Sequence, residues 1–178
     1  MSKHHNGKND FTEKVGTRMT VIAWIVVLGM LTIIFSGHLQ RLSNPNQQVQ
    51  SVNINGTQEV VLNQNRSGHY IATAVFNDVP VDVIVDTGAT NVSVPENVAN
   101  KLGLVKGQRM NVSTANGTIS VYSTMIKSIK LGNIVVYDVR ASINPFMGDD
   151  IVLLGMSYLD HLEFSHSNNE LVLKQVNN

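Results

Sequence analysis

The sequence lacks cysteine altogether. That absence excludes a disulfide framework, a thiolate nucleophile, cysteine-ligated zinc and a lipid-modified cysteine anchor. An excess of either charge is also missing, because 13 basic and 13 acidic residues give a formal net charge of zero. Since binding to nucleic acid usually requires a basic face that neutralises phosphates, this balance argues against nucleic acid as a partner.

Metal and cofactor patterns are missing as well. The histidines show no spacing typical of a metal site; they are His4, His5, His38, His69, His161 and His166. Asp149 and Asp150 precede an apolar run, where a solvated turn explains them more simply than a cation site. No serine stands in a G-x-S-x-G context, which argues against a serine hydrolase. We therefore expect no metal and no cofactor.

One long apolar run stands near the N-terminus. Met19 to Phe35 contains no charged residue, and its extension to residue 39 reaches the roughly 20 residues that cross a bilayer core. A cleaved signal peptide is the alternative, but it has a shorter apolar region, and the sequence after Phe35 is a poor cleavage site. The sequence therefore predicts an uncleaved signal anchor over 19–39.

The flanks of this run predict its orientation. Four basic residues precede it, whereas Arg41 stands alone after it until Arg66. Because cytoplasmic flanks carry the excess of lysine and arginine, we expect a cytoplasmic tail over 1–18. The rest of a single-pass protein of the inner (cytoplasmic) membrane then lies in the periplasm or outside the cell.

The remainder reads as a linker followed by a β-rich domain. Residues 40–65 are rich in Asn and Gln and predict a solvated linker, with a weak strand over 51–54. Residues 66–178 predict one mostly β domain. Turn residues divide it into strands over 69–76, 79–85, 108–114, 118–129, 135–143, 151–154, 162–164 and 170–173. One short helix is expected over 95–103, between Pro95 and Gly103.

One predicted strand ends in a carboxylate, where Val85 leads directly into Asp86, Thr87 and Gly88. These are common turn residues, so a plain turn is one interpretation. A catalytic interpretation requires a second acid, because peptide hydrolysis by carboxylates uses two acids that share one proton. A threonine hydroxyl can bond to a partner loop, and a glycine lets its amide approach the carboxylate closely.

The stretch from Val83 to Thr90 resembles the catalytic loop of the aspartic proteases, in which apolar residues precede Asp-Thr/Ser-Gly. Ile151-Val152-Leu153-Leu154-Gly155 resembles the second signature of that family, and Ser113 to Ile119 resembles its flap hairpin. Their order is that of a retropepsin-like protease of the bacterial, membrane-anchored kind. The resemblance covers 66–175 and implies a mostly β, single-lobe retropepsin-like barrel with one short helix, preceded by one transmembrane helix.

The resemblance also implies roles for single residues. Asp86 activates water, Thr87 makes a hydroxyl bond across a dimer, and Gly88 provides the close amide. Leu153, Leu154 and Gly155 support the catalytic loop from behind. An extended peptide substrate contacts the loop and the flap through Ala89, Thr114, Ala115, Asn116, Gly117, Thr118 and Ile119.

The second acid is not in the same chain, because no other aspartate is followed by Thr-Gly or Ser-Gly. It must come from a second copy, and the resemblance implies the same, since retropepsins are homodimers. Two Asp86 carboxylates then meet on a two-fold axis, and a shared membrane raises the effective concentration of the subunits. The alternative is a non-catalytic, membrane-anchored dimerisation or peptide-binding module of the same fold; the intact Asp86-Thr87-Gly88 favours the protease.

Overall fold

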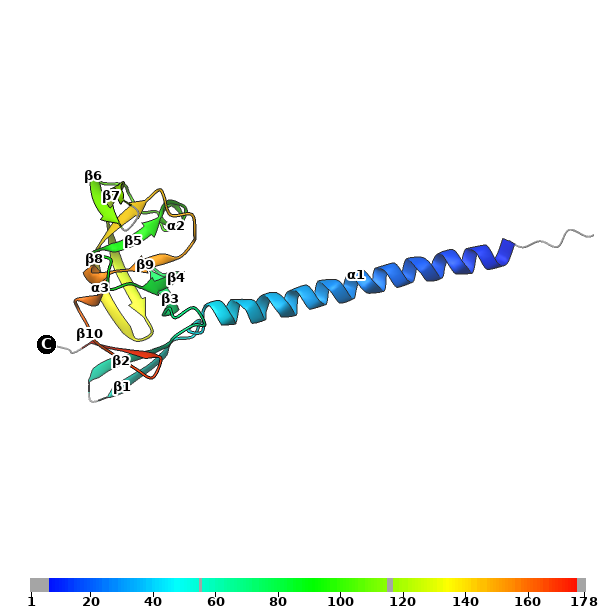
Figure 1. Ribbon diagram of the computed structural model, residues 1–178, viewed down its shortest axis with the longest axis horizontal. Helices are drawn as coiled ribbons and strands as arrows, with labels where there is room; N and C mark the ends of the chain where they lie inside the picture. The colour runs from blue at the N-terminus through cyan, green and yellow to red at the C-terminus, as the bar shows by residue number, and fades with distance from the viewer. Residues whose placement is uncertain (1–6, 55, 115–116, 176–178) are drawn as a thin grey trace, which may run out of the picture. The chain divides into compact units, whose positions relative to one another are not determined.

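A computed structural model describes residues 7–54, 56–114 and 117–175. The chain divides into two compact units, Met1–Arg41 and Leu42–Asn178. Helix α1 (Gly7–Ser43) makes up most of the first unit, and the second unit is a β-rich body (Figure 1).

Helix α1 contains a segment, Arg18–Gly37, that is long and apolar enough to cross a membrane. The apolar side chains of this segment are exposed. The hydroxyls of Thr32 and Ser36 donate to the carbonyls of Leu28 (2.7 Å) and Ile33 (2.9 Å). These two hydroxyl groups thus find their hydrogen-bond acceptors within the helix.

The body contains strands and two short helices. In chain order they are β1 (Gln50–Ile54), β2 (Thr57–Asn63), β3 (Ile71–Phe76), β4 (Val79–Val85), β5 (Val92–Pro95), α2 (Glu96–Lys101), β6 (Arg109–Thr114), β7 (Gly117–Leu131), β8 (Ile134–Asn144), β9 (Val152–Leu154), α3 (Met156–Leu159), β10 (Glu163–Ser167) and β11 (Glu170–Gln175). The mostly β prediction is confirmed. The prediction of a single short helix is wrong, because α3 follows β9.

A seven-stranded sheet forms most of the body, in the order β3-β4-β9-β5-β8-β7-β6. β3 also pairs with the far end of β7, where Val75 and Phe76 lie opposite Lys130 and Ile129. This additional pairing closes the sheet into a barrel and leaves β6 outside it. β6 pairs with the first part of β7 and forms the predicted flap hairpin, at the end of the body away from β1 and β2 (Figure 1).

The two ends of the body meet in a four-stranded sheet of order β1-β2-β11-β10. The weak strand predicted over 51–54 matches β1, whose residues are all exposed. The prediction of a solvated linker over 40–65 is wrong for β2, which is partly buried. The two middle strands of this sheet contribute to the hydrophobic core. Val60 and Leu62 of β2 are fully buried, and Leu171 and Leu173 of β11 join the same core. Because this core also contains Phe76, Ile126 and Leu154 of the other sheet, one hydrophobic cluster fixes both sheets together.

Polar residues ahead of β1 are also part of the body. The Asn46 amide donates to the carbonyls of Asn63 (2.9 Å) and Ile71 (2.7 Å), and its oxygen accepts the Asn63 N–H (2.7 Å). Asn44 donates to a carboxylate oxygen of Asp82 (2.9 Å) and accepts the Asn46 N–H (3.0 Å). Both asparagines are buried, and these bonds replace the water that they lose.

Candidate active site

The catalytic-loop sequence begins where β4 ends. β4 runs parallel to β9, with Val85 opposite Leu154. The Val85 N–H donates to the Tyr70 carbonyl (3.0 Å), and the Asp86 N–H donates to the Leu154 carbonyl (3.2 Å). The backbone of Asp86 is therefore bonded to β9, immediately before Gly155.

A tight turn surrounds the Asp86 carboxylate. Its Oδ1 accepts the Gly88 N–H (2.9 Å), and the Asp86 carbonyl accepts the Ala89 N–H (3.2 Å). A Cβ at Gly88 would lie 3.2 Å from Oδ1, so glycine gives this amide its close approach. The second carboxylate oxygen accepts no hydrogen bond from the described residues, and the side chain is half-buried. One oxygen is thus oriented by the chain, and the other is available to a reacting water.

Thr87 and Gly88 form the exposed tip of this turn. Within the described residues of one chain, the Thr87 hydroxyl makes no hydrogen bond. An exposed hydroxyl beside a candidate catalytic acid is available to a second molecule, which is the role that the resemblance implies for it.

Gly155 lies against the back of the catalytic loop. A Cβ at this position would lie 2.4 Å from the Asn91 carbonyl oxygen and 2.6 Å from that of Ala89, distances that no side chain allows. Its backbone is extended (φ −89°, ψ −174°), so glycine is needed here for space rather than for conformation. The next amides donate to the loop, from Met156 to the Ala89 carbonyl (2.8 Å) and from Ser157 to the Thr90 carbonyl (3.0 Å). Leu154 is buried beneath the loop, whereas Leu153 faces the cavity described below.

Ser157 adds a support that no sequence motif indicated. Its hydroxyl accepts the Val92 N–H (2.9 Å) and donates to the Arg140 carbonyl (2.7 Å). One side chain of α3 therefore connects β5 with β8 at the end of the catalytic loop. The sequence around Ser157 does not indicate this role, because the hydrogen-bond partners of its side chain lie far away in the sequence.

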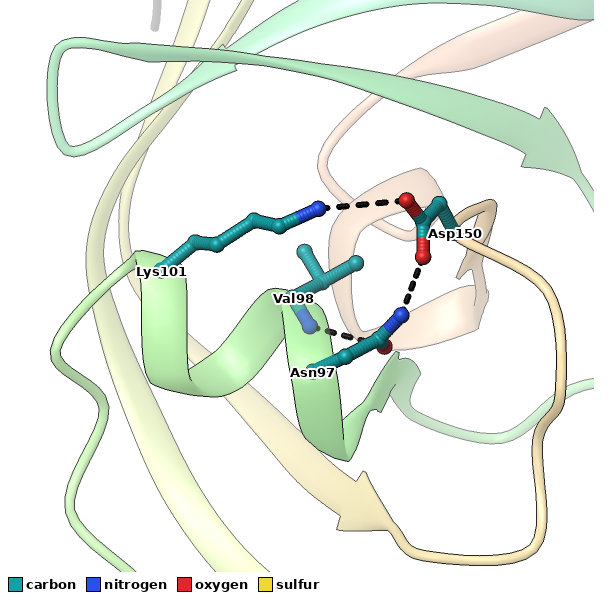
Figure 2. Close-up of polar contacts among 4 residues, drawn as sticks. All are labelled: Asn97, Val98, Lys101 and Asp150. Carbon is teal, nitrogen blue, oxygen red and sulfur yellow. Dashed lines mark hydrogen bonds and ion pairs between the residues drawn. The ribbon is translucent and has the colours of Figure 1, made fainter.

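A polar contact joins α2 to the segment before β9 (Figure 2). Asn97 donates to one oxygen of Asp150, and Lys101 pairs with the other at 3.1 Å. Asp150 is thus part of a structural contact, and the described residues contain no group of side chains that could bind a metal. Because Lys101 and Asp150 are exposed, this ion pair contributes at most about 1 kcal/mol.

A cavity of about 350 Å³ opens in front of Asp86. Its wall combines the catalytic loop, the flap, β8 and Leu153, and Asp86 is the only acid among the described residues that line it. From the flap come Val112, Ser113, Thr114, Ile119 and Val121. Val112 and Ile119 are cross-strand neighbours, so the hairpin presents an apolar pair to the cavity.

Some of the residues predicted to contact the substrate line this cavity, and others do not. Ala89, Thr114 and Ile119 line the cavity, and Gly117 and Thr118 do not. Ala115 and Asn116 lie outside the described residues. The sequence did not indicate the polar lining formed by Asn91, Ser93, Ser142 and Asn144. Ser142 and Asn144 of β8 are only 6% and 8% exposed. Polar residues are rarely buried in a core strand, and the burial of a polar side chain distinguishes these two from the other residues of β8.

Known proteins resemble this chain over the same region. Residues 72–161 match a family model described as "gag-polyprotein putative aspartyl protease". A protein from the cobV 5′ region of Sinorhizobium sp is 30% identical over 159 residues, which are 83% of this chain and 68% of that one. A protein of Rickettsia prowazekii (strain Madrid E) is 28% identical over 120 residues, 65% of this chain and 50% of that one. Both relatives are described as uncharacterised.

A solved structure resembles the body. The crystal structure of a retropepsin-like aspartic protease from Rickettsia conorii matches with a TM-score of 0.57 and 26% identity, over 72% of this chain and 96% of that one. The matched residues 72–161 include the catalytic loop, the flap, β9 and α3 of this chain. The chain therefore belongs to the family of retropepsin-like aspartyl proteases.

Proposed function

We propose that the protein is a membrane-anchored aspartic endopeptidase that works as a homodimer with one Asp86 from each copy. The observation that carries this proposal is a cavity in which Asp86 is the only acid among the described lining residues. Hydrolysis by carboxylates requires two acids. Retropepsin-like proteases act as dimers on peptide substrates, so the missing acid is that of a second copy related by two-fold symmetry.

The two carboxylates share the chemistry. The ionised one removes a proton from water as the water oxygen attacks the scissile carbonyl carbon. The protonated one donates to the carbonyl oxygen, and a proton then passes to the leaving amide nitrogen as the C–N bond breaks. The Gly88 N–H keeps Oδ1 of each Asp86 in place (2.9 Å), and the exposed Thr87 hydroxyl is free to reach the other copy.

The flap provides the cover for the substrate. An extended peptide satisfies its backbone groups as an added strand, while pockets recognise alternate side chains. The apolar pair of Val112 and Ile119 fits an apolar side chain of the substrate, and Ser142 and Asn144 offer hydrogen bonds from the opposite wall.

The apolar segment of α1 is the proposed signal anchor. Its length fits one crossing, and the basic residues ahead of it favour an N-terminus in the cytoplasm. The body then lies on the periplasmic or external side. Confinement to the membrane plane raises the chance that two copies meet, which favours a dimer with a small interface.

The test uses the full chain in neutral detergent and its Asp86→Asn variant, with a peptide library and mass spectrometry from acid to neutral pH. We expect cleavage by the unmodified chain with a bell-shaped pH profile, because only the singly protonated pair is active. Asp86→Asn should lower the rate at least about a thousandfold. Asp78→Asn, at an exposed turn, is the matched control and should keep full activity. A folded, dimeric chain that cuts nothing would favour the non-catalytic module instead.

A further inference from the structure

A second groove, larger than the cavity at Asp86, lies beside it. It has a volume of about 710 Å³ and is bordered by β7, β8 and the loop 103–107. The function proposed above makes no use of it. Its chemistry nevertheless differs sharply from that of the cavity at Asp86.

Apolar and cationic side chains are combined in this groove. Val105, Met110 and Met125 line it and are 81%, 39% and 51% exposed, which is unusual for large apolar residues. Lys127 and Arg140 also line it, and no acid is found among its described lining residues. Met125 is the direct cross-strand neighbour of Arg140, so apolar and cationic groups alternate on one face.

No described residue of the chain neutralises either cation. Lys127 and Arg140 form no ion pair with a described residue, whereas Lys101, Lys106 and Lys174 all do. Two unpaired cations beside an apolar wall favour a ligand that carries carboxylates next to apolar groups. The carboxylates satisfy the cations, and the apolar groups cover the methionines and the valine.

The groove is preformed. Backbone hydrogen bonds join the loop to β7. The Gly107 N–H donates to the Ser123 carbonyl (2.7 Å), and the Ser123 N–H donates to the Gln108 carbonyl (2.9 Å). The Thr124 hydroxyl donates to the Val105 carbonyl (2.9 Å). Lys106 pairs with Glu96 and lies 4.9 Å from the centre of the Tyr122 ring, which fixes the loop from its other side. A ligand therefore does not have to order this wall, and that lowers the cost of binding.

The groove is adjacent to the cavity at Asp86. Asn91 lines both of them, and its carbonyl oxygen packs on Gly155 behind the catalytic loop. A polypeptide that lies in the cavity can thus continue into the groove past one side chain. This adjacency favours a further part of the substrate over an unrelated partner.

We propose that this groove binds an acidic and apolar segment of the substrate, beyond the residues that lie at Asp86. The inference rests on the proposed endopeptidase function and specifies its substrates: polypeptides with Glu or Asp next to Leu, Met or Val at some distance from the scissile bond. Lys127 and Arg140 are the residues that select for the acids, and Met110 and Met125 contact the apolar side chains.

The first experiment measures binding without any catalysis. The full-length Asp86→Asn chain in neutral detergent is titrated into a rhodamine-labelled octapeptide of alternating leucine and glutamate, and into its leucine–glutamine counterpart. Fluorescence anisotropy should show at least about fivefold tighter binding of the glutamate peptide. Raising the salt concentration to about 0.5 M should remove most of that difference, because the contacts are partly exposed charge pairs.

Further variants test whether the groove causes the preference for the glutamate peptide. When Lys127→Gln and Arg140→Gln are added to the Asp86→Asn chain, the two peptides should bind equally. Adding Lys130→Gln and Arg66→Gln instead, at exposed positions outside the groove lining, should leave the fivefold preference intact. Equal binding of both peptides to the unaltered groove, or a preference that survives the Lys127 and Arg140 changes, would overturn the proposal.

The second experiment asks whether the occupant is substrate. In a peptide library treated with the active full-length chain, cleaved peptides should be enriched in Glu and Asp away from the cut. Lys127→Gln with Arg140→Gln should raise KM about fivefold for those peptides with little change in kcat, because the groove affects binding alone. Cleavage without any acidic enrichment would overturn the assignment to substrate. Absence of all cleavage together with intact peptide binding would contradict the proposed protease function and not the chemistry of the groove.

Discussion

The catalytic loop and the flap border the same cavity, yet they are stabilised in opposite ways. Backbone bonds tie the loop to its surroundings, with Asp86 bonded to Leu154, Met156 to Ala89 and Ser157 to Thr90. These partners belong to β9 and α3, whose residues Leu154, Tyr158 and Leu159 are fully buried. The acid is therefore fixed to the core of the body.

The flap has little such support. Five of the six residues of β6 are exposed, so few core contacts restrain it. Apart from its strand pairing, it is stabilised by a row of polar side chains, in which Arg109 donates to Ser120 (3.0 Å) and Ser120 donates to Asn111 (2.9 Å). The proposed catalysis requires a rigid acid and a cover that opens to admit a polypeptide. The difference in burial between the two regions satisfies both requirements.

The largest expected effect comes from filling the space at Gly155. Gly155→Ala forces a methyl group against the carbonyls of Asn91 and Ala89 and should destabilise the body by about 3 kcal/mol or more. Thermal unfolding followed by circular dichroism measures it. Gly148→Ala is the matched control, because nothing lies within 4 Å of its added Cβ. Equal melting temperatures for the two variants would mean that the loop does not depend on this packing.

Ser157→Ala tests the side-chain support of the loop. It leaves the Val92 N–H and the Arg140 carbonyl without their partner and should cost about 1–3 kcal/mol of unfolding free energy. Urea denaturation gives the value. Ser165→Ala, at an exposed position of β10, should change stability by less than about 0.5 kcal/mol. If Ser157→Ala were equally neutral, its two hydrogen bonds would not contribute to the rigidity proposed here.

A change in the flap should separate binding from folding. Ile119→Ser removes one half of the apolar pair over the cavity and should raise KM roughly tenfold, since about 1–2 kcal/mol of apolar contact is lost. The melting temperature should hardly change, because the flap is largely exposed. Ile119→Val should restore most of the affinity. A large loss of stability would show that the flap belongs to the rigid core after all.

The smallest expected effect concerns Tyr158, in the core behind the loop. Burial raises the pKa of its hydroxyl above the ordinary value of 10.0, and this hydroxyl has no partner among the described residues. Above about pH 10 the unfolded chain loses this proton and the folded chain keeps it, so folding stability should fall as pH rises.

Tyr158→Phe should weaken that alkaline decline and change stability near neutral pH by no more than about 1 kcal/mol, in the stabilising direction. Denaturation at pH 7 and pH 11 measures both effects. An unchanged slope with pH, or a loss of several kcal/mol at pH 7, would indicate that the hydroxyl does have a partner.

Local patterns in the sequence predict much of this fold. The hairpin of β3 and β4 follows from Asn77 and Asp78, which adopt the left-handed conformation (φ 46° and 70°) that a two-residue turn requires. Apolar alternation predicts most barrel strands within a few residues. The catalytic-loop motif and the downstream Leu153-Leu154-Gly155 lie together because β4 and β9 are parallel neighbours.

Features that depend on distant contacts could not be predicted. Asn44 and Asn46 look solvated in an Asn- and Gln-rich segment, yet partners as distant as Ile71 and Asp82 bury them. The helix α3 has only four residues, too few to show a helical period. Ser142 and Asn144 follow no motif, and only the closed barrel shows that they line the cavity.

The central claim is that two copies of the chain each contribute one Asp86, and mixed dimers test it most directly. Differently tagged unmodified and Asp86→Asn chains are co-expressed in varying ratios, the dimers are exchanged in detergent, and peptide cleavage is measured per total chain. Random pairing makes activity fall as the square of the unmodified fraction, to about a quarter at an equal mixture. A linear fall, to about half at an equal mixture, would mean that each Asp86 acts independently, and about three quarters would mean that one Asp86 per dimer is sufficient. Either result would contradict the account.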